Sequence, residues 1–158
     1  MNINSKIDKK QLALNIAVPL GLGLISSLLT KNGMKEFASI NQPTLTPPPW
    51  AFAVAWTVLY ILMGISSYII RTNDKEQTKN AVAFYTLQIV VNVTWPLIFF
   101  GAKAYLFAFV WLLILWALTA VMTFFFWRID KTAALLQIPY IIWLTFAAYL
   151  NFGVYVLN

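Results

Sequence analysis

The sequence predicts an all-α membrane protein, a bundle of five transmembrane helices. Hydrophobic residues make up 61% of the 158-residue chain and charged residues only 10%, whereas a typical soluble domain carries about 25% charged residues. All acidic and basic residues fall between long apolar segments, as expected where a charge in lipid is costly. Five spans of about 20 residues would use roughly 100 positions, which leaves short loops and a single transmembrane domain over residues 1–158.

The apolar segments and the prolines set the expected bounds of the five helices. A helix rises about 1.5 Å per residue and needs about 20 residues to cross the hydrocarbon core. Three consecutive prolines, Pro47–Pro49, cannot lie inside a helix, but the last can occupy a first turn. Pro96 is expected to bend the third helix, and Pro139 lies near the start of the fifth. The expected helices span about 11–30, 49–70, 80–101, 105–127 and 132–157.

The first apolar segment follows Lys6, Lys9 and Lys10 and superficially resembles a signal peptide. We interpret it as a membrane anchor, because it is longer than the roughly 7–15 apolar residues of a signal sequence and no A-x-A-like site closes it. The connection from Lys31 to Thr46 is expected to be an ordered external loop. Such a loop could act as a lid or as a passive connector, and the sequence leaves both open.

Lysines and arginines are distributed unequally between the two sides of the expected membrane. Eight belong to the N-terminus, the second loop and the fourth loop, and three belong to the opposite side. The positive-inside rule then places the N-terminus in the cytoplasm and the C-terminus and first loop outside. We expect an integral, multi-pass membrane protein, and a bacterial cell membrane is its expected location. The basic residues of the less charged side are Lys31, Lys35 and Lys103.

Composition excludes several classes of chemistry. The chain has no cysteine and no histidine, so disulfides, thiol chemistry and the commonest transition-metal ligands are absent, and no metal site is expected. No general acid or base lies inside the spans, which argues against hydrolytic or phosphoryl chemistry. The net charge of +6 is scattered over loops, where membrane lipids are nearer partners than nucleic acid. No cofactor is required, and no catalytic residue is assigned.

Polar and aromatic side chains at depth in the spans are the candidate functional residues. Trp56 and Tyr60 stand four apart and share one helix face. Asn92 and Trp95 share a face of the third helix. Amide side chains at depth need partners, so these faces either pack between helices or line a cavity. The fifth helix carries a stripe of Trp143, Ala147 and Leu150, whereas Trp50, Trp111 and Trp127 are assigned to the membrane interfaces.

Four motifs occur in order along nearly the whole chain. The first is Pro43-x-x-x-Pro47-Pro48, and the second is Phe52-x-x-x-Trp56-x-x-Leu59-Tyr60-x-x-x-Gly64. The third is Asn92-x-x-Trp95-x-x-x-Phe99-Phe100-Gly101, and the fourth is Pro139-Tyr140-x-x-Trp143-x-x-Phe146-Ala147-x-x-Leu150-Asn151. Together they resemble the tryptophan-rich sensory protein and translocator protein family (TspO/MBR).

The resemblance implies a five-helix bundle, usually a homodimer, with a cavity near the first loop. In the family this cavity binds porphyrins, haem and, in animal members, cholesterol and benzodiazepine-type drugs. Carried over position by position, the expected ligand site consists of Phe37, Trp56, Tyr60, Asn92, Trp95, Trp143, Ala147 and Leu150, with Pro43, Pro47 and Pro48 in a loop that would gate it.

The chain also departs from the family pattern. The segment Gln42-Pro43-Thr44-Leu45 lacks the lysine and the tryptophan that often precede the paired prolines, and Phe37 stands where a tyrosine is common. These departures put the contacts of a lid in doubt. Tyr155 is followed by Val-Leu-Asn, so the sterol motif of animal members, which needs a basic residue after the tyrosine, is not supported.

The expected function is therefore binding of tetrapyrroles, as a sensor or transporter of porphyrins. Without histidine or cysteine, the usual axial ligands of haem are missing, so metal-free porphyrin or loosely bound haem is the expected ligand. One alternative is a light-dependent, porphyrin-degrading enzyme that uses Trp56 and Trp143 as redox partners. A second is binding of a lipid or sterol, and a third is a structural membrane protein whose tryptophans only pack.

Overall fold

The computed structural model describes residues 7–158, apart from the side chains of residues 34 and 36. Lys6, counted above on the N-terminal side, lies outside the described residues. Five helical segments of the described chain are long and apolar enough to cross a membrane, and residues 7–158 contain no strand. The predicted all-α, five-helix membrane bundle is therefore confirmed. The elements are α1 (Lys9–Leu29), α2 (Lys31–Phe37), α3 (Pro49–Arg71), α4 (Thr78–Pro96), the π-helix η1 (Leu97–Gly101), α5 (Tyr105–Ile129), α6 (Lys131–Leu135) and α7 (Ile138–Leu157).

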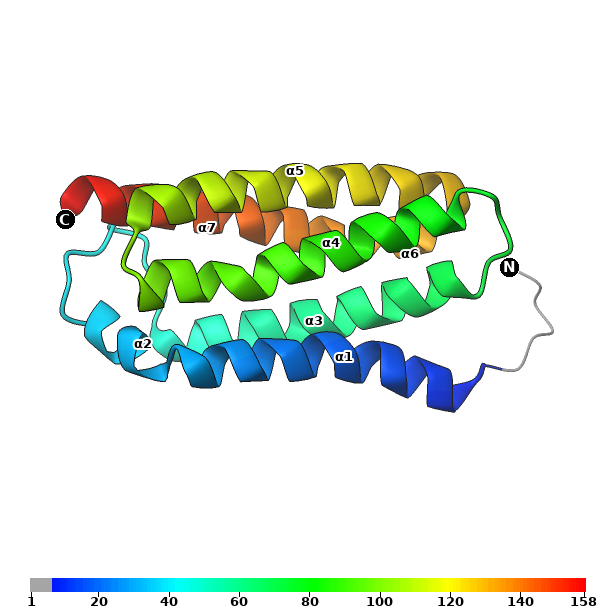
Figure 1. The fold of residues 1–158 in the computed structure, drawn as a ribbon, viewed down its shortest axis with the longest axis horizontal. Coiled ribbons are helices and arrows are strands. Elements are labelled where there is room, and N and C mark those ends of the chain that lie inside the picture. Colours follow the sequence, from blue (N-terminus) through cyan, green and yellow to red (C-terminus); the bar gives the residue numbers. More distant parts are fainter. Residues whose placement is uncertain (1–6) are drawn as a thin grey trace.

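The long helices run side by side along one axis (Figure 1). Helix α1 packs chiefly on α3, and α5 packs on both α4 and α7. The connection between α2 and α3 lies at the same end of the bundle as the C-terminus, whereas the connection between α3 and α4 lies at the other end (Figure 1). This antiparallel order is the one that short loops between spanning helices impose.

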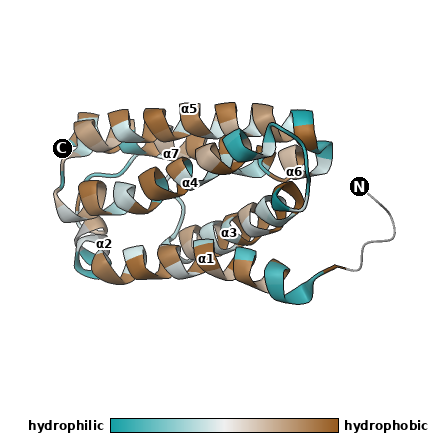
Figure 2. Ribbon diagram, turned by 45° about the vertical axis from the view of Figure 1, so that its right-hand side comes forward, coloured by the Kyte–Doolittle hydropathy of each residue, from teal (hydrophilic) through white to brown (hydrophobic). Residues whose placement is uncertain are grey.

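The outside of the bundle is apolar along its length. Large hydrophobic side chains on the long helices, such as Val54, Leu113 and Ile142, are exposed. Hydrophilic residues gather instead at the start of α1 and at the connection between α3 and α4 (Figure 2). A surface of this kind suits lipid rather than water.

Helices α1 and α3 approach each other closely at Gly64, which is buried. A Cβ atom at this position would lie 2.5 Å from the Cα atom of Ile16 and 2.7 Å from the carbonyl oxygen of Asn15. One turn further along α3, the Ser67 hydroxyl donates a hydrogen bond of 3.0 Å to Asn15 Oδ1. A small residue and an interhelical hydrogen bond are the usual means of joining helices in a membrane, where lipid removes the hydrophobic driving force.

The structure corrects the expected first loop, because its first half is the short helix α2. The seven residues of α2 are too few and too polar to show a helical period in the sequence. The second half of the loop is held against the end of α7. Asn41 N donates to Asn158 Oδ1 (3.1 Å), and Asn158 Nδ2 donates to Asn41 O (2.9 Å). Pro43 is buried and occupies the space that a side chain at Gly153 would need.

The prolines Pro48 and Pro49 lead into α3 as predicted. Pro48 is the N-cap residue with an extended backbone (φ −63°, ψ 151°), and Pro49 is the first residue of the helix. A proline fits there because the first turn has no acceptors for its amide groups.

Pro96 is followed by a π-helical turn in the third span. Helix α4 includes Pro96 and passes directly into η1, where Ala102 N donates to Leu97 O at 2.9 Å, five residues back. Proline has no N–H group to donate to the carbonyl four residues earlier and its ring crowds that carbonyl. The widened turn after it is one way in which a helix absorbs this disturbance.

The fifth span is interrupted near Pro139, where one continuous helix was expected. Helix α6 ends at Leu135 and α7 begins at Ile138. In a continuous helix Pro139 would have to donate to the Leu135 carbonyl, which its ring instead crowds. Gln137, at the break, is fully buried.

Candidate functional site

Five aromatic side chains from α3 and α7 form an inner aromatic cluster around Trp56. Its indole stacks on Tyr60, with ring centroids 5.5 Å apart and planes at 30°. The same indole meets Tyr140 (6.2 Å, 66°) and Trp143 (6.4 Å, 85°) edge to face. Phe52 closes the cluster on the other side of Trp143 (5.9 Å, 76°). Offset and edge-to-face contacts of this kind are the favoured arrangements of aromatic pairs.

A chain of hydrogen bonds runs beneath the inner aromatic cluster. Tyr60 Oη donates to Asn92 Oδ1 (2.7 Å), and Asn92 Nδ2 donates to Tyr140 Oη (2.8 Å). Tyr140 Oη donates in turn to Gln88 Oε1 (3.1 Å). Asn92, Tyr140 and Gln88 are all buried. The chain therefore joins α3, α4 and α7 by pairing polar groups that would be costly alone in an apolar interior.

A second group, the outer aromatic cluster, lies nearer the first loop and consists of Phe37, Trp95, Phe99, Phe100 and Tyr105. Trp95 and Phe99 stack (5.0 Å, 22°), and Phe37 and Tyr105 both tilt against Phe99 (5.8 and 5.1 Å). The cluster joins α2, the end of α4, η1 and the start of α5.

Asn151 of α7 fixes the outer aromatic cluster to the bundle. Its Oδ1 accepts from Trp95 Nε1 (3.1 Å), and its Nδ2 donates to the Tyr105 carbonyl (2.8 Å). Asn151 is 1% exposed. One buried amide thereby sets the orientation of the Trp95 ring.

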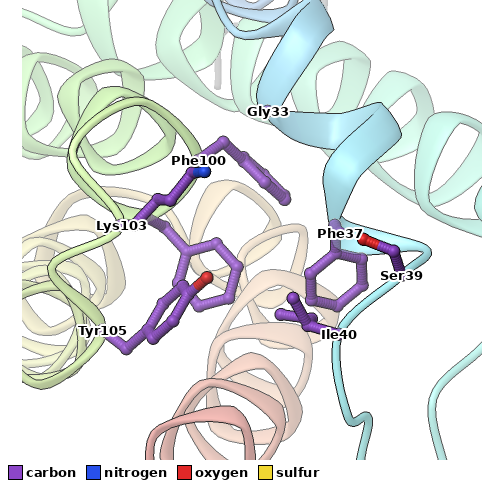
Figure 3. Close-up of a pocket in the computed structure, with 8 residues that line it drawn as sticks. Gly33, Phe37, Ser39, Ile40, Phe100, Lys103 and Tyr105 are labelled. Atoms are coloured by element: carbon purple, nitrogen blue, oxygen red, sulfur yellow. The ribbon is translucent and has the colours of Figure 1, made fainter. Parts of the chain in front are cut away.

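A cavity of about 320 Å³ opens beside the outer aromatic cluster. In Figure 3, Phe37 and Ile40 on the loop side face Phe100 and Tyr105 across it. Lys103 stands at the edge of the cavity with φ 53°, in the left-handed region. The lining residues are Gly33, Phe37, Ser39, Ile40, Phe99, Phe100, Lys103 and Tyr105.

Six of the eight expected site residues are divided between the two aromatic clusters, and the other two lie on α7. Trp56, Tyr60, Asn92 and Trp143 meet in or beneath the inner aromatic cluster. Trp95 and Phe37 belong to the outer aromatic cluster. On α7, Leu150 is buried and Ala147 packs partly buried against the core. Of the loop prolines, Pro43 is buried and Pro48 is exposed.

Sequence reasoning did not assign several residues that the structure adds to these groups. Tyr140 and Gln88 complete the hydrogen-bond chain. The sequence feature that could have identified them is a polar side chain in the middle of an apolar span. Tyr105, Ile40 and Lys103 line the cavity, yet nothing in their spacing separates them from ordinary residues at the end of a span.

Trp143 differs from Trp95 in that its indole nitrogen is buried and finds no hydrogen-bond partner among the described residues. Tryptophan N–H groups usually find an acceptor when they are buried. An unpaired donor at the inner aromatic cluster is therefore available to an acceptor that is not part of the chain.

Five apolar spans that enclose two aromatic clusters, with no group of metal-ligating residues in the part of the chain described, define a polytopic membrane protein with an aromatic interior. Residues 15–157 match the TspO/MBR family. The chain therefore belongs to the TspO/MBR family, as the four sequence motifs predicted.

Relatives from bacteria and animals match over most of the chain. It is 34% identical to the tryptophan-rich protein TspO of Chlorobaculum tepidum, over 93% of this chain and 95% of the relative. It is 36% identical to the tryptophan-rich sensory protein of Cereibacter sphaeroides, over 77% of this chain and 76% of the relative. It is also 34% identical to the translocator protein of Homo sapiens, over 89% of this chain and 85% of the relative.

Proposed function

We propose that the protein binds tetrapyrroles within the membrane and acts as a sensor or transporter of porphyrins. The observation that carries the proposal is the inner aromatic cluster, where the indoles of Trp56 and Trp143 meet at an edge-to-face contact of 6.4 Å between α3 and α7. A planar macrocycle placed between aromatic faces would bury apolar area at about 25 cal/mol per Å². Stacking against the rings would add to this. The names of two relatives, a sensory protein and a translocator protein, support both roles.

Binding at the inner aromatic cluster requires the rings to separate, because Trp56 contacts Tyr60, Tyr140 and Trp143 directly. The cavity of about 320 Å³ beside Phe37 is at the lower end of the roughly 300–1,000 Å³ of ligand pockets. A macrocycle would therefore pass the cavity only with movement of α2, which carries Phe37. In the proposal, the unpaired Trp143 N–H group then donates to an acceptor atom of the ligand.

Replacing Trp56 by leucine is expected to weaken protoporphyrin binding about ten-fold or more, because one stacking face is lost. The affinity would be measured by titrating the purified protein with protoporphyrin and following the Soret band. Trp127→Leu is the matched control, because Trp127 is 49% exposed and lies outside both clusters. Absence of saturable binding to the parent protein, or equal losses in the two variants, would contradict the proposal.

A second candidate is light-dependent degradation of porphyrin, with Trp56 and Trp143 as redox partners. The direct contact of the two indoles, together with the stacked Tyr60 ring, favours it because an electron could pass between touching rings. Under illumination in air, the parent protein is then expected to accelerate the loss of the Soret band of bound protoporphyrin. A Trp56→Phe, Trp143→Phe double variant that bleaches the porphyrin as fast as the parent would exclude this candidate.

The proposed orientation has the N-terminus in the cytoplasm and the first loop outside. Seven basic residues of the described chain flank the end of the bundle where α1 begins, whereas Lys31, Lys35 and Lys103 flank the other end. The positive-inside rule supports this orientation. The seven residues are Lys9, Lys10, Arg71, Lys75, Lys79, Arg128 and Lys131.

A further inference from the structure

A second cavity lies between α1, α3 and α4. Its volume is about 290 Å³, and its lining residues are Leu14, Asn15, Val18, Ser67, Arg71 and Tyr85. Arg71 is the last residue of α3, so a rise of 1.5 Å per residue places it about 16 Å along the helix from Tyr60. The Arg71 end of this groove is therefore separate from the candidate tetrapyrrole site, and none of the residues that line the groove belongs to either aromatic cluster.

Hydrogen bonds hold the Arg71 side chain over the groove. Arg71 Nε donates to Ser67 Oγ (3.2 Å), and Ser67 Oγ donates to Asn15 Oδ1 (3.0 Å). Asn15 Nδ2 is itself bound to the Gln11 carbonyl (2.9 Å). Ser67, only 2% exposed, is thus the fixed centre of a chain that orients the guanidinium. The chain occupies Nε and leaves the two terminal nitrogens of Arg71 available.

Tyr85 supplies a second donor to the same groove. Its side chain is 6% exposed and its ring lies parallel to that of Phe126 (6.4 Å, 22°). Its hydroxyl is buried beside Ser67 and Arg71 and makes no well-aligned hydrogen bond with any of residues 7–158. A buried, unpaired hydroxyl costs free energy, and it is unusual enough in a folded protein to indicate a partner outside the chain.

The charges and the rim of the groove define the chemistry of that partner. The Arg71 guanidinium bonds to Ser67 and to no carboxylate of the described residues. Arginine binds oxyanions through two parallel N–H bonds, which suits phosphate and carboxylate groups. Leu14 and Val18 stand four apart on α1 and are 55% and 56% exposed, so the rim of the groove is apolar. A partner with an oxyanion next to a hydrocarbon chain matches both features.

We propose that this groove binds the phosphate group of a phospholipid. The terminal nitrogens of Arg71 and the Tyr85 hydroxyl donate to the phosphate oxygens, and an acyl chain lies along Leu14 and Val18. Arg71 is the last residue of a span and therefore lies at the depth of the lipid headgroups. Most basic residues of the described chain flank this end of the bundle, which attracts anionic lipids. Both observations favour a lipid over phosphate free in solution.

Native mass spectrometry of the full chain in a neutral detergent, titrated with phosphatidylglycerol, tests the proposal. Arg71→Gln is expected to lower lipid retention about ten-fold or more, because a charged, two-pronged contact is lost. Arg71→Lys should lose most of this retention, because an ammonium group lacks the planar fork. Tyr85→Phe should lower it less. Arg128→Gln is the matched control, since Arg128 lies over the Phe124 ring (5.7 Å) outside the groove.

Thermal unfolding in lipid-free detergent checks that each variant folds. In this measurement Tyr85→Phe is expected to be at least as stable as the parent, because the substitution removes only an unpaired hydroxyl. Equal lipid retention by Arg71→Gln and the parent, or an equal loss in Arg128→Gln, would overturn the proposal. A parallel titration with inorganic phosphate distinguishes a lipid phosphate group from phosphate free in solution. Stabilisation that depends on Arg71 with inorganic phosphate but not with phosphatidylglycerol would overturn the assignment to a lipid.

Discussion

Asn92→Leu is expected to lower the free energy of unfolding by about 2–3 kcal/mol, because it leaves the half-buried Tyr60 hydroxyl without an acceptor and leaves the Tyr140 hydroxyl with only its bond to Gln88. Asn92 accepts from Tyr60 and donates to Tyr140 (2.7 and 2.8 Å), and leucine has nearly the same shape but no polar atom. The measurement is unfolding of the purified protein in mixed micelles with increasing SDS, followed by circular dichroism.

Asn80→Leu is the control for Asn92→Leu, because Asn80 is exposed on the same helix. A double-mutant cycle with Tyr60→Phe tests the mechanism. Once the Tyr60 hydroxyl is gone, Asn92→Leu should cost less than in the parent, since neighbours in one network are not additive. Strictly additive losses would show that the Tyr60 to Asn92 bond contributes nothing to stability.

Gly64→Ala is the second substitution with a large expected effect, a loss of about 3 kcal/mol through overpacking. The added Cβ would lie 2.5 Å from Ile16 Cα and 2.7 Å from Asn15 O. Both are backbone atoms, so no side chain can rotate away and α1 has to shift from α3. The shift should show in the same SDS titration as an earlier loss of helicity.

Gly21→Ala is the matched control for Gly64→Ala. Gly21 also lies inside a helix, α1, but nothing lies within 4 Å of the position of an added Cβ atom. Alanine is a better helix former than glycine, so a gain of about 0.5–1 kcal/mol is expected. If the two alanine variants unfold alike, close approach at Gly64 does not limit the packing of α1.

The spans were predictable from the sequence because charge and hydropathy alone delimit them, and lipid leaves few alternatives to a helix. The start of α3 at Pro49 followed from the chemistry of proline. The sequence predicted a disturbance at Pro96 and a proline near the start of the fifth helix. It did not predict that the chain would form a π-helical turn after Pro96 and a break before Pro139. A proline in a sequence signals a disturbance, whereas the neighbouring packing decides whether the chain bends, widens or stops.

The candidate site was predictable in composition but not in arrangement. The spacing of Trp56 and Tyr60 predicted a shared face, and their rings do stack. The division into an inner and an outer aromatic cluster depends on how α2 and η1 fold over the end of the bundle, which no spacing reveals. The expected homodimer stays a prediction, because the structure is of a single chain.

The hydrogen bonds between Asn41 and Asn158 couple the first loop to the end of α7, although the two residues are 117 positions apart. Asn158 also donates to the Val154 carbonyl (2.9 Å), so it closes the last turn of α7. Lifting the first loop from α7 breaks the bonds that hold Asn158 in place, and fraying of the last turn in turn releases the loop. By thermodynamic linkage, a change that loosens the last turn of α7 would therefore also loosen the first loop, and the reverse holds equally.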